Sequence, residues 1–379
     1  MRLRASKPVA ILLLLAAVIL AVFVVWRQSM RPGQSHYDRG LDEAAANRMD
    51  RAEREWLAGT RFDPEFAGNY VALGDLYSAM GRAKDAVERY RAAARVTPDD
   101  GKLSLKLAHA DEAAHDEGAA IADAKRAAGL LPSDPDALSY YGALLARMNQ
   151  PSAAIPVLRR TLSLTPDNAD ALIYLVRAEI QQRDLATAEG HLSPFVQRHP
   201  GNAEACYLMA YLLHQKPQTP DNLRSAIDYA TRAHNGAPAN DQASMLLGQL
   251  LLSDGKPADA LSAFRQAQSV TPLSQPVLTG LIACYTRLGQ PALARQMSAT
   301  LAAVVARRER LALLQDHLTQ HPEDTAAALQ AARLEEANQN LSLAHSYFSQ
   351  AVAHAPGDPG AKAALDAFLK RQRVASSAQ

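Results

Sequence analysis

The stretch that decides the fold is residues 70–98, which reads YVALGDLYSAMGRAKDAVERYRAAARVTP. It ends in a proline, and prolines recur along the chain at nearly constant intervals. They are Pro64, Pro98, Pro132, Pro166, Pro200, Pro238, Pro272, Pro322 and Pro356, of which the first five stand 34 residues apart. A constant period of this length is typical of arrays of helical hairpins. The sequence therefore predicts stacked two-helix units, whose joint surface suits binding rather than catalysis.

The residues between the prolines repeat with the same period. Twelve positions before a proline stands an alanine, namely Ala52, Ala86, Ala120, Ala154, Ala188, Ala226, Ala260 and Ala344. Twenty-four positions before it the residue is small, as at Gly40, Gly74, Ala108, Gly142, Val176, Gly248 and Ala332. Eight positions before it the residue is mostly large and apolar: Trp56, Tyr90, Leu158, Leu192, Phe264, Leu314 and Phe348. Small residues let two helices approach closely, and the large ones fill the space beside the crossing.

One unit carries the whole pattern, at Tyr70, Leu73, Gly74, Tyr77, Ala86, Tyr90, Ala93 and Pro98. It resembles the tetratricopeptide repeat family at every key position of that family's motif. The resemblance covers about residues 33–356. It implies an all-α fold, a right-handed superhelical solenoid of about nine helix hairpins. The sequence before the solenoid, at residues 9–26, adds one predicted transmembrane helix.

Two intervals depart from 34 residues. The interval from Pro200 to Pro238 is 38 residues, and we expect its extra residues, at 216–220, to lengthen a surface loop. The interval from Pro272 to Pro322 is 50 residues and has neither Gly nor Pro at 292–321, which predicts one continuous helix over 291–320. We favour a helix that bridges two sub-solenoids; the alternative is an element that docks a partner or a second copy. Deletion of residues 305–320 is expected to leave a folded protein.

Residues 9–26 contain no charged or polar side chain. Eighteen helical residues span about 27 Å, enough for a bilayer core. The run ends in Arg27 without small residues placed for cleavage, so we interpret it as an uncleaved signal anchor rather than a signal peptide. We expect a single-pass membrane protein with a cytoplasmic N-terminus and extracytoplasmic repeats, periplasmic if the source is bacterial.

These features predict a linear domain order. It is a cytoplasmic segment (1–8), the anchor (9–26), a linker (27–35), the solenoid (36–356, with the long helix at about 291–320), a capping helix (357–373) and a disordered tail (374–379). A capping helix is expected because a stack of repeats otherwise ends in an open apolar face.

Chemistry-bearing motifs are sparse. There is no phosphate-binding loop, hydrolase elbow or paired-cysteine metal motif. Cys206 and Cys284 fall two repeats apart, too far for a disulfide, and are expected in the core. His109, Glu112 and His115 follow helical spacing and could bind a metal weakly, although we favour a solvated helix end. We therefore predict no enzymatic activity, no cofactor and no metal.

The resemblance also implies a concave groove, lined by first helices, that binds peptides. The side chains it places there include Arg147, Arg177, Tyr207, Tyr211, His214 and Gln249. Arg and Tyr dominate binding hot spots in protein interfaces, although ordinary surface residues explain the same pattern equally well. The carboxylate clamp of the chaperone-binding members is missing, because Val71, Asp75, Leu105 and His109 occupy the matching places.

The function that these features favour is a non-enzymatic, membrane-anchored scaffold that holds partner proteins or peptides in the cell envelope. One alternative is a regulatory or substrate-presenting subunit of a separate membrane enzyme, such as a glycosyltransferase or protease. Another is a structural protein that self-assembles, since the sequence leaves homo-oligomerisation open. A net charge of +1 argues against nucleic acid as a partner.

Overall fold

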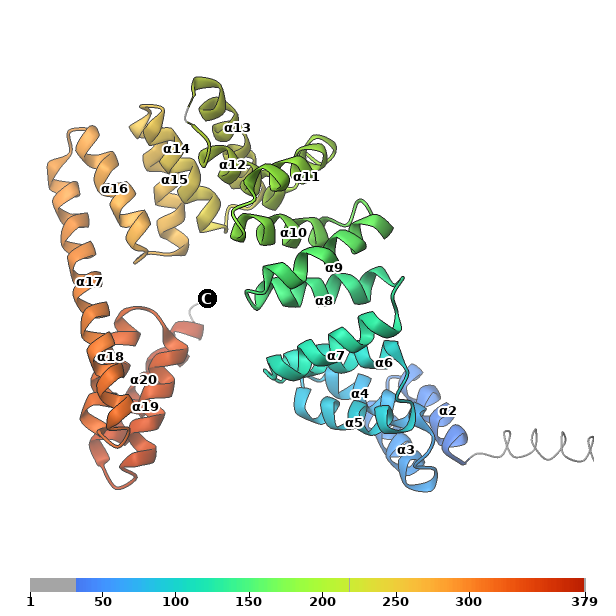
Figure 1. Ribbon diagram of the computed structural model, residues 1–379. Helices are drawn as coiled ribbons and strands as arrows, with labels where there is room; N and C mark the ends of the chain where they lie inside the picture. Colours follow the sequence, from blue (N-terminus) through green and yellow to red (C-terminus); the bar gives the residue numbers. More distant parts are fainter. Residues whose placement is uncertain (1–31, 218, 378–379) are drawn as a thin grey trace, which may run out of the picture. The chain divides into compact units, whose positions relative to one another are not determined.

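The computed structural model describes residues 32–217 and 219–377, and every regular element in these two ranges is an α-helix (Figure 1). The all-α prediction is confirmed for this part of the chain. The apolar run at residues 9–26, for which we predict a membrane anchor, lies outside the described residues. Among the helices inside them, none has both the length and the apolar composition needed to cross a bilayer.

The chain divides into two compact units, with the boundary between His191 and Leu192. Across the described ranges the helices follow one another as nine hairpins and a final single helix, in agreement with the predicted number. Even-numbered helices up to α18 are first helices and odd-numbered ones are second helices. The helices of the first unit are α2 (Pro32–Ala45), α3 (Met49–Phe62), α4 (Ala67–Ala79), α5 (Ala83–Val96), α6 (Gly101–Ala113), α7 (Glu117–Leu130), α8 (Pro135–Arg147), α9 (Pro151–Leu164), α10 (Ala169–Gln181) and α11 (Leu185–Arg198), within which the boundary falls.

The helices of the second unit are α12 (Ala203–His214), α13 (Pro220–Gly236), α14 (Asp241–Ser253), α15 (Pro257–Val270), α16 (Gln275–Arg287), α17 (Pro291–Gln320), α18 (Thr325–Ala337), α19 (Leu341–His354) and α20 (Pro359–Ser377). Of these, α20 stands after the last hairpin. It packs against α19, where the rings of Phe368 and Phe348 lie with their centroids 5.2 Å apart. Both rings are buried, so α20 covers the end of the stack as predicted for a capping helix.

The start of most first helices is determined by an Asp or Asn two residues after the repeat proline. The side chains of Asp100, Asp134, Asn168, Asn202, Asn240 and Asp324 each accept a hydrogen bond from a backbone N–H of the following first turn. Such N-caps satisfy donors that the helix cannot pair internally. The proline therefore occupies the turn between hairpins, and the cap starts the next first helix.

In eight of the nine hairpins of the described ranges, the turn between the two helices contains a residue with positive φ. These residues are Asn47, Gly81, His115, Asn149, Arg183, Gly255, Gly289 and Gln339. Their backbone lies in the left-handed region, which glycine adopts readily and other residues adopt at a cost. Three of the eight are glycine.

The core follows the 34-residue pattern. All eight repeat alanines are completely buried. A Cβ added to Gly74 would lie 2.4 Å from the ring of Tyr90, and one added to Gly142 would lie 2.6 Å from Leu158. In these hairpins the small residue of the first helix thus makes room for the large residue of the second helix, as the sequence predicts.

The 38-residue interval lengthens a helix as well as a loop. The helix α13 has 17 residues, whereas most second helices have 14. The expectation that the extra residues only lengthen a loop is therefore wrong in part. Pro220 is compatible with the first helical turn, and Thr219 caps it by accepting a hydrogen bond from the N–H of Asn222, so the helix starts early.

The long helix α17 has the bounds predicted from the sequence and contains 30 residues. Its second half is part of the core: Leu311, Leu314 and Leu318 are buried in a cluster with Ala328 of α18. That half packs against α18, the first helix of the last hairpin, as a second helix packs against the next first helix elsewhere in the chain. Residues 305–320 are therefore part of the core of the intact chain, and the folding of a chain that lacks them stays a prediction.

Both ends of the described part are more helical than predicted. The helix α2 begins at Pro32, inside the predicted linker, because proline is suited to the first turn of a helix. The helix α20 continues to Ser377, so residues 374–377 are not the disordered tail that we predicted. No Gly or Pro follows Arg373 to stop the helix.

Candidate protein-binding surface

The six predicted groove residues all lie on first helices, divided between the two units. Arg147 at the end of α8 and Arg177 in α10 belong to the first unit and are exposed. The other four, in the second unit, are half-buried: Tyr207, Tyr211 and His214 in α12, and Gln249 in α14. The structure therefore presents two sets of candidate side chains.

In the first unit, polar side chains connect neighbouring first helices. Asp75 of α4 accepts hydrogen bonds from the Nζ of Lys106 in α6 at 2.5 and 2.6 Å. Glu112 of α6 accepts one from the hydroxyl of Tyr140 at 2.7 Å and another from the guanidinium of Arg147. Arg147 is thus engaged with Glu112, and a ligand would have to compete for it.

The histidine stripe considered as a weak metal site does not form on one helix. The helix α6 ends at Ala113, and His115 follows in the turn with φ 63°. The ring of His109 lies 3.8 Å from that of Tyr140, and burial lowers the pKa of His109. Across residues 32–217 and 219–377, no group of three His, Cys, Asp or Glu side chains is placed to hold a metal ion.

In the second unit, a cavity of 460 Å³ opens between the first helices α14 and α16. Gln249 and Leu252 line it from α14, and Thr279 and Ala283 line it from α16. The ring of Phe264 also borders the cavity. Gln249 is thus the predicted groove residue that the structure places at a cavity.

A second cavity, of 410 Å³, lies in the first unit beside α2 and α4. Its lining is mainly apolar and includes Leu41 and Met80, each more than two-fifths exposed. Val71 and Asp75, which hold two of the places of the missing carboxylate clamp, also line it. The first helices therefore border a cavity in each unit.

One of the remaining candidates, Tyr207, contributes to packing. Tyr207 lies against the buried cluster of Cys206, Ala233 and Ala243. Cys206 and Cys284 are both buried free thiols, as predicted. Burial raises the pKa of the Cys284 thiol to about 11, so it is protonated at neutral pH.

One set of interactions was not predicted from the sequence. A basic residue of a second helix reaches a buried acid 20 residues later, on the next first helix. The Nη2 of Arg91 donates to Asp111 at 2.9 Å, and the Nη2 of Arg159 donates to Glu179 at 2.9 Å. The 20-residue spacing was the signal that could have revealed these pairs.

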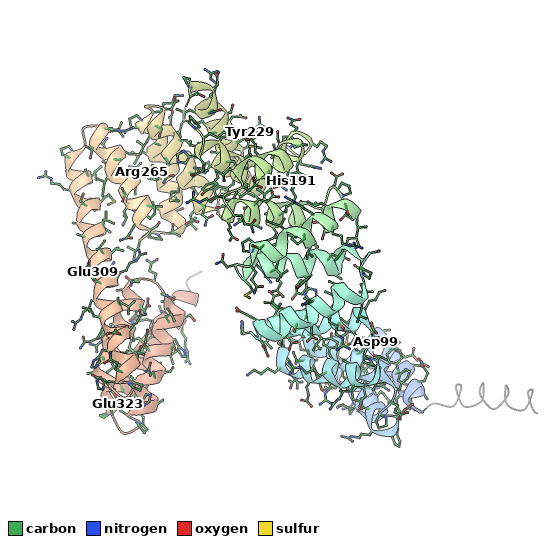
Figure 2. All side chains as sticks on the ribbon, viewed as in Figure 1. Asp99, His191, Tyr229, Arg265, Glu309 and Glu323 are labelled. Atoms are coloured by element: carbon green, nitrogen blue, oxygen red, sulfur yellow. The ribbon has the colours of Figure 1, made fainter. Side chains whose placement is uncertain are left out.

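The same 20-residue spacing recurs in the second unit, with other types of side chain. Arg265, labelled in Figure 2, donates to the hydroxyl of Tyr285 at 3.3 Å, again across 20 residues. Glu335 is the third buried acid of the set, and residue 315 stands where its arginine would be. That residue is Gln315, which donates to the hydroxyl of Tyr347 instead. Within the described part of the chain, no basic side chain pairs with Glu335; its carboxylate is hydrogen-bonded to Asn340.

Family comparison identifies the repeats in three stretches, residues 70–104, 135–178 and 222–274, each matching a model described as tetratricopeptide repeat. These stretches are tetratricopeptide repeats. The resemblance seen in residues 70–98 is thereby confirmed, and repeats of the same family occur in both units. A tetratricopeptide array is typical of non-enzymatic scaffold proteins.

Solved structures of repeat proteins resemble parts of the chain. MamA protein is 19% identical, with 50% of this chain and 99% of that chain covered and a TM-score of 0.42. YrrB, titled a TPR protein with an unusual peptide-binding site, is 18% identical, with coverages of 50% and 95% and a TM-score of 0.44. A tetratricopeptide repeat protein from Parabacteroides merdae is 15% identical, with coverages of 67% and 99% and a TM-score of 0.48. The comparison with curated proteins gave no match.

Proposed function

We propose that this chain is a non-enzymatic, membrane-anchored tetratricopeptide scaffold that binds partner proteins in the cell envelope. The observation that carries the binding function is the cavity of 460 Å³ between two successive first helices, α14 and α16. Its walls combine apolar side chains with a few polar groups, such as Gln249 and Thr279. Concave sites of this composition are the usual places where proteins bind small molecules, and a side chain of a partner protein would enter this one in the same way.

The exposed ion pairs between first helices are consistent with this proposal. The Lys106–Asp75 and Arg147–Glu112 pairs are each roughly two-fifths exposed. Exposed pairs contribute little to stability, because water competes for both charges. Their side chains can therefore exchange an intramolecular partner for a ligand at small cost.

Two predicted first-helix side chains outside this cavity, Arg177 in the first unit and Tyr211 in the second, are tested by combining Arg177→Glu with Tyr211→Ala in the tagged full chain. Partner proteins would be captured from detergent-solubilised membranes and quantified by mass spectrometry. We expect capture to fall by about tenfold, as for loss of interface hot spots. Helix content and melting temperature should stay close to those of the unaltered chain.

The matched control changes second helices in the same way. Lys125→Glu with Gln197→Ala alters one exposed cation and one exposed amide, on α7 and α11. This pair should leave capture unchanged. Equal capture by the two double variants, or loss of folding in the first, would refute a binding role for Arg177 and Tyr211.

Support for the membrane anchor comes from the uncharged run at residues 9–26. A reporter enzyme that is active only outside the cytoplasm, fused after Gln379, should be active. Removal of residues 9–26 should abolish that activity. Release of the protein from membranes by carbonate, without detergent, would rule out an integral anchor.

A further inference from the structure

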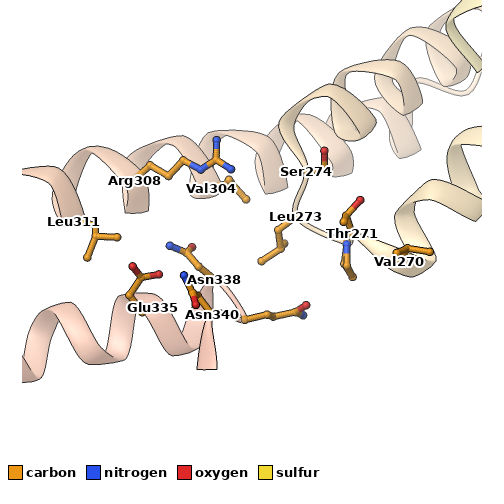
Figure 3. Close-up of a pocket in the computed structure, with 12 residues that line it drawn as sticks. Val270, Thr271, Leu273, Ser274, Val304, Arg308, Leu311, Glu335, Asn338 and Asn340 are labelled. Atoms are coloured by element: carbon orange, nitrogen blue, oxygen red, sulfur yellow. The ribbon is translucent and has the colours of Figure 1, made fainter. Parts of the chain in front are cut away.

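A cavity of 520 Å³ lies beside the middle of α17, in the second unit (Figure 3). Val304, Arg308 and Leu311 of α17 form one wall. The opposite wall is the end of α18 and the turn after it, at residues 335–340, and the connection at residues 270–274 closes the third side. None of these residues belongs to the predicted groove.

This cavity follows from the extra length of α17. At the start of α16, Gln275 accepts a hydrogen bond from the Nη1 of Arg308 at 2.8 Å. Just after α18, Asn338 accepts one from the Nε of Arg307 at 3.1 Å. The start of one first helix and the end of another therefore contact the same turn of α17. The cavity lies where the part of α17 that packs against α16 meets the part that packs against α18.

Glu335 gives the cavity its chemical character. The residue is only 4% exposed and lines the wall opposite Leu311. Burial raises the pKa of this carboxyl, with the hydrogen bond to Asn340 opposing the shift. A buried carboxylate without a cation is costly, and elsewhere in this chain an arginine is supplied, by Arg91 for Asp111 and by Arg159 for Glu179.

We propose that this cavity binds an arginine side chain of a partner protein, with its guanidinium on the Glu335 carboxylate and its carbon stem along Val304 and Leu311. The inference rests on the proposed protein-binding function and adds to it a second, chemically defined site. Arginine is favoured over lysine because its several N–H groups can reach the carboxylate and a neighbouring amide oxygen together. The amide side chains of Asn338 and Asn340 lie in the same wall.

The positive charges around the cavity limit the affinity of such a ligand. Arg308 lies in the wall, engaged with Gln275, and Arg307 is engaged with Asn338. Arg308→Gln removes one like charge while leaving Glu335 in place. We therefore expect this variant to bind an arginine-bearing peptide more tightly than the unaltered chain.

The test uses a phage library of random short peptides, selected on the full chain in detergent. Binders that are lost on Glu335→Gln should be enriched in arginine flanked by apolar residues. Glu335→Gln keeps the shape of the side chain and removes its charge, so those peptides should bind about tenfold more weakly. Circular dichroism would establish that the variant remains helical.

A second variant supplies the missing arginine from within the chain. Gln315→Arg places a guanidinium at the position that Arg91 and Arg159 occupy in their hairpins. It should raise the melting temperature and block the selected peptides, although residue 315 does not line the cavity. The matched control is Asp316→Asn, which removes an exposed charge from the adjacent position and should change neither property.

The two proposals fail in different ways. Selected peptides without arginine enrichment, or arginine peptides that bind Glu335→Gln equally well, would overturn the cavity proposal while leaving the first-helix surface intact. Loss of partner capture only in the Arg177 and Tyr211 double variant would also show that the cavity is not the main site. Failure of every peptide to bind the unaltered chain would overturn the cavity proposal alone, because partner capture is measured separately.

Discussion

The residues at positive φ inside the hairpins differ in chemical type but occupy the same place. Gly81, Gly255 and Gly289 adopt this conformation without strain, whereas Arg183 adopts it at φ 64° and His115 at φ 63°. The left-handed region costs an L-residue about 1–2 kcal/mol. The helices on either side of these turns are regular. The free-energy cost is therefore confined to the residue with positive φ, and a substitution of that residue can remove it.

We expect Arg183→Gly to raise the stability of the full chain by about 0.5–1 kcal/mol, since glycine's greater freedom in the unfolded state offsets part of the gain. Chemical denaturation would measure the change. The matched control is Gly81→Ala, where an added Cβ meets nothing within 4 Å, so any loss comes from the backbone alone. A loss of stability in Arg183→Gly would contradict the strain argument.

Asp111 makes the stability of its hairpin depend on pH. Burial raises the pKa of its carboxyl from 3.8 to about 6; the neighbouring Asp123 and Asp116 add to the rise, and Arg91 opposes it. Because the folded chain binds this proton more tightly than the unfolded chain, the contribution of Asp111 falls as pH rises from about 4 to 6.

We therefore expect the free energy of unfolding of Asp111→Asn to fall less than that of the unaltered chain between about pH 4 and 6. The difference should be on the order of 2 kcal/mol. Thermal denaturation at a series of pH values would show a flatter profile. Asp99→Asn, at an exposed position labelled in Figure 2, serves as the control and should keep the original profile. Identical profiles for both variants would show that Asp111 titrates normally.

At the scale of the element, α17 acts as a second helix twice along its length. Leu314 is 7% exposed and belongs to the buried cluster beside α18, whereas its neighbour Leu313 is 66% exposed. We expect Leu314→Ala to destabilise the protein by about 3 kcal/mol and Leu313→Ala to change stability by less than about 0.5 kcal/mol. Chemical denaturation of the two variants compares them directly. Equal effects would show that the second half of α17 is not packed as described.

Most of the elements could be predicted because each is specified by residues close to it in sequence. The absence of Gly and Pro after Pro291 predicts α17, and the repeat alanines predict the buried face of each second helix. The left-handed turn at Arg183 could not be predicted, because arginine does not favour that conformation.

The candidate sites were harder to predict than the elements. Six first-helix residues followed from the resemblance, and the structure places one of them, Gln249, in the wall of a cavity. The cavity beside α17 joins residues 270–274 with residues 335–340, which are far apart in sequence. No pattern within a short stretch of sequence predicts that these two segments line the same cavity. The one feature of the sequence that pointed to this cavity is Gln315, which stands 20 residues before Glu335 where the other pairs have an arginine.

At the scale of the whole molecule, each hairpin depends mainly on its neighbours. A Cβ added to Gly280 would lie 2.3 Å from the ring of Phe264, which is buried in the preceding hairpin. We expect Gly280→Ala to speed amide hydrogen exchange in α14–α17 and to leave exchange in α4–α8 unchanged. Faster exchange throughout the chain would instead indicate a single cooperative structure. Gly129→Ala, where the added Cβ meets nothing within 4 Å, is the control.

The length of α17 also bears on how the array acquired its present spacing. The 50 residues from Pro272 to Pro322 fall 18 short of two full periods, and the 30 residues of α17 exceed two 14-residue second helices by two. Removal of 18 residues, a 13-residue first helix and five of the seven residues in its adjoining turns, from two full repeats would leave this spacing and would join two second helices end to end. An array of this kind would tolerate the loss of a fraction of a repeat, because both halves of α17 carry buried apolar residues, Ala294 and Val304 in the first half and Leu311, Leu314 and Leu318 in the second.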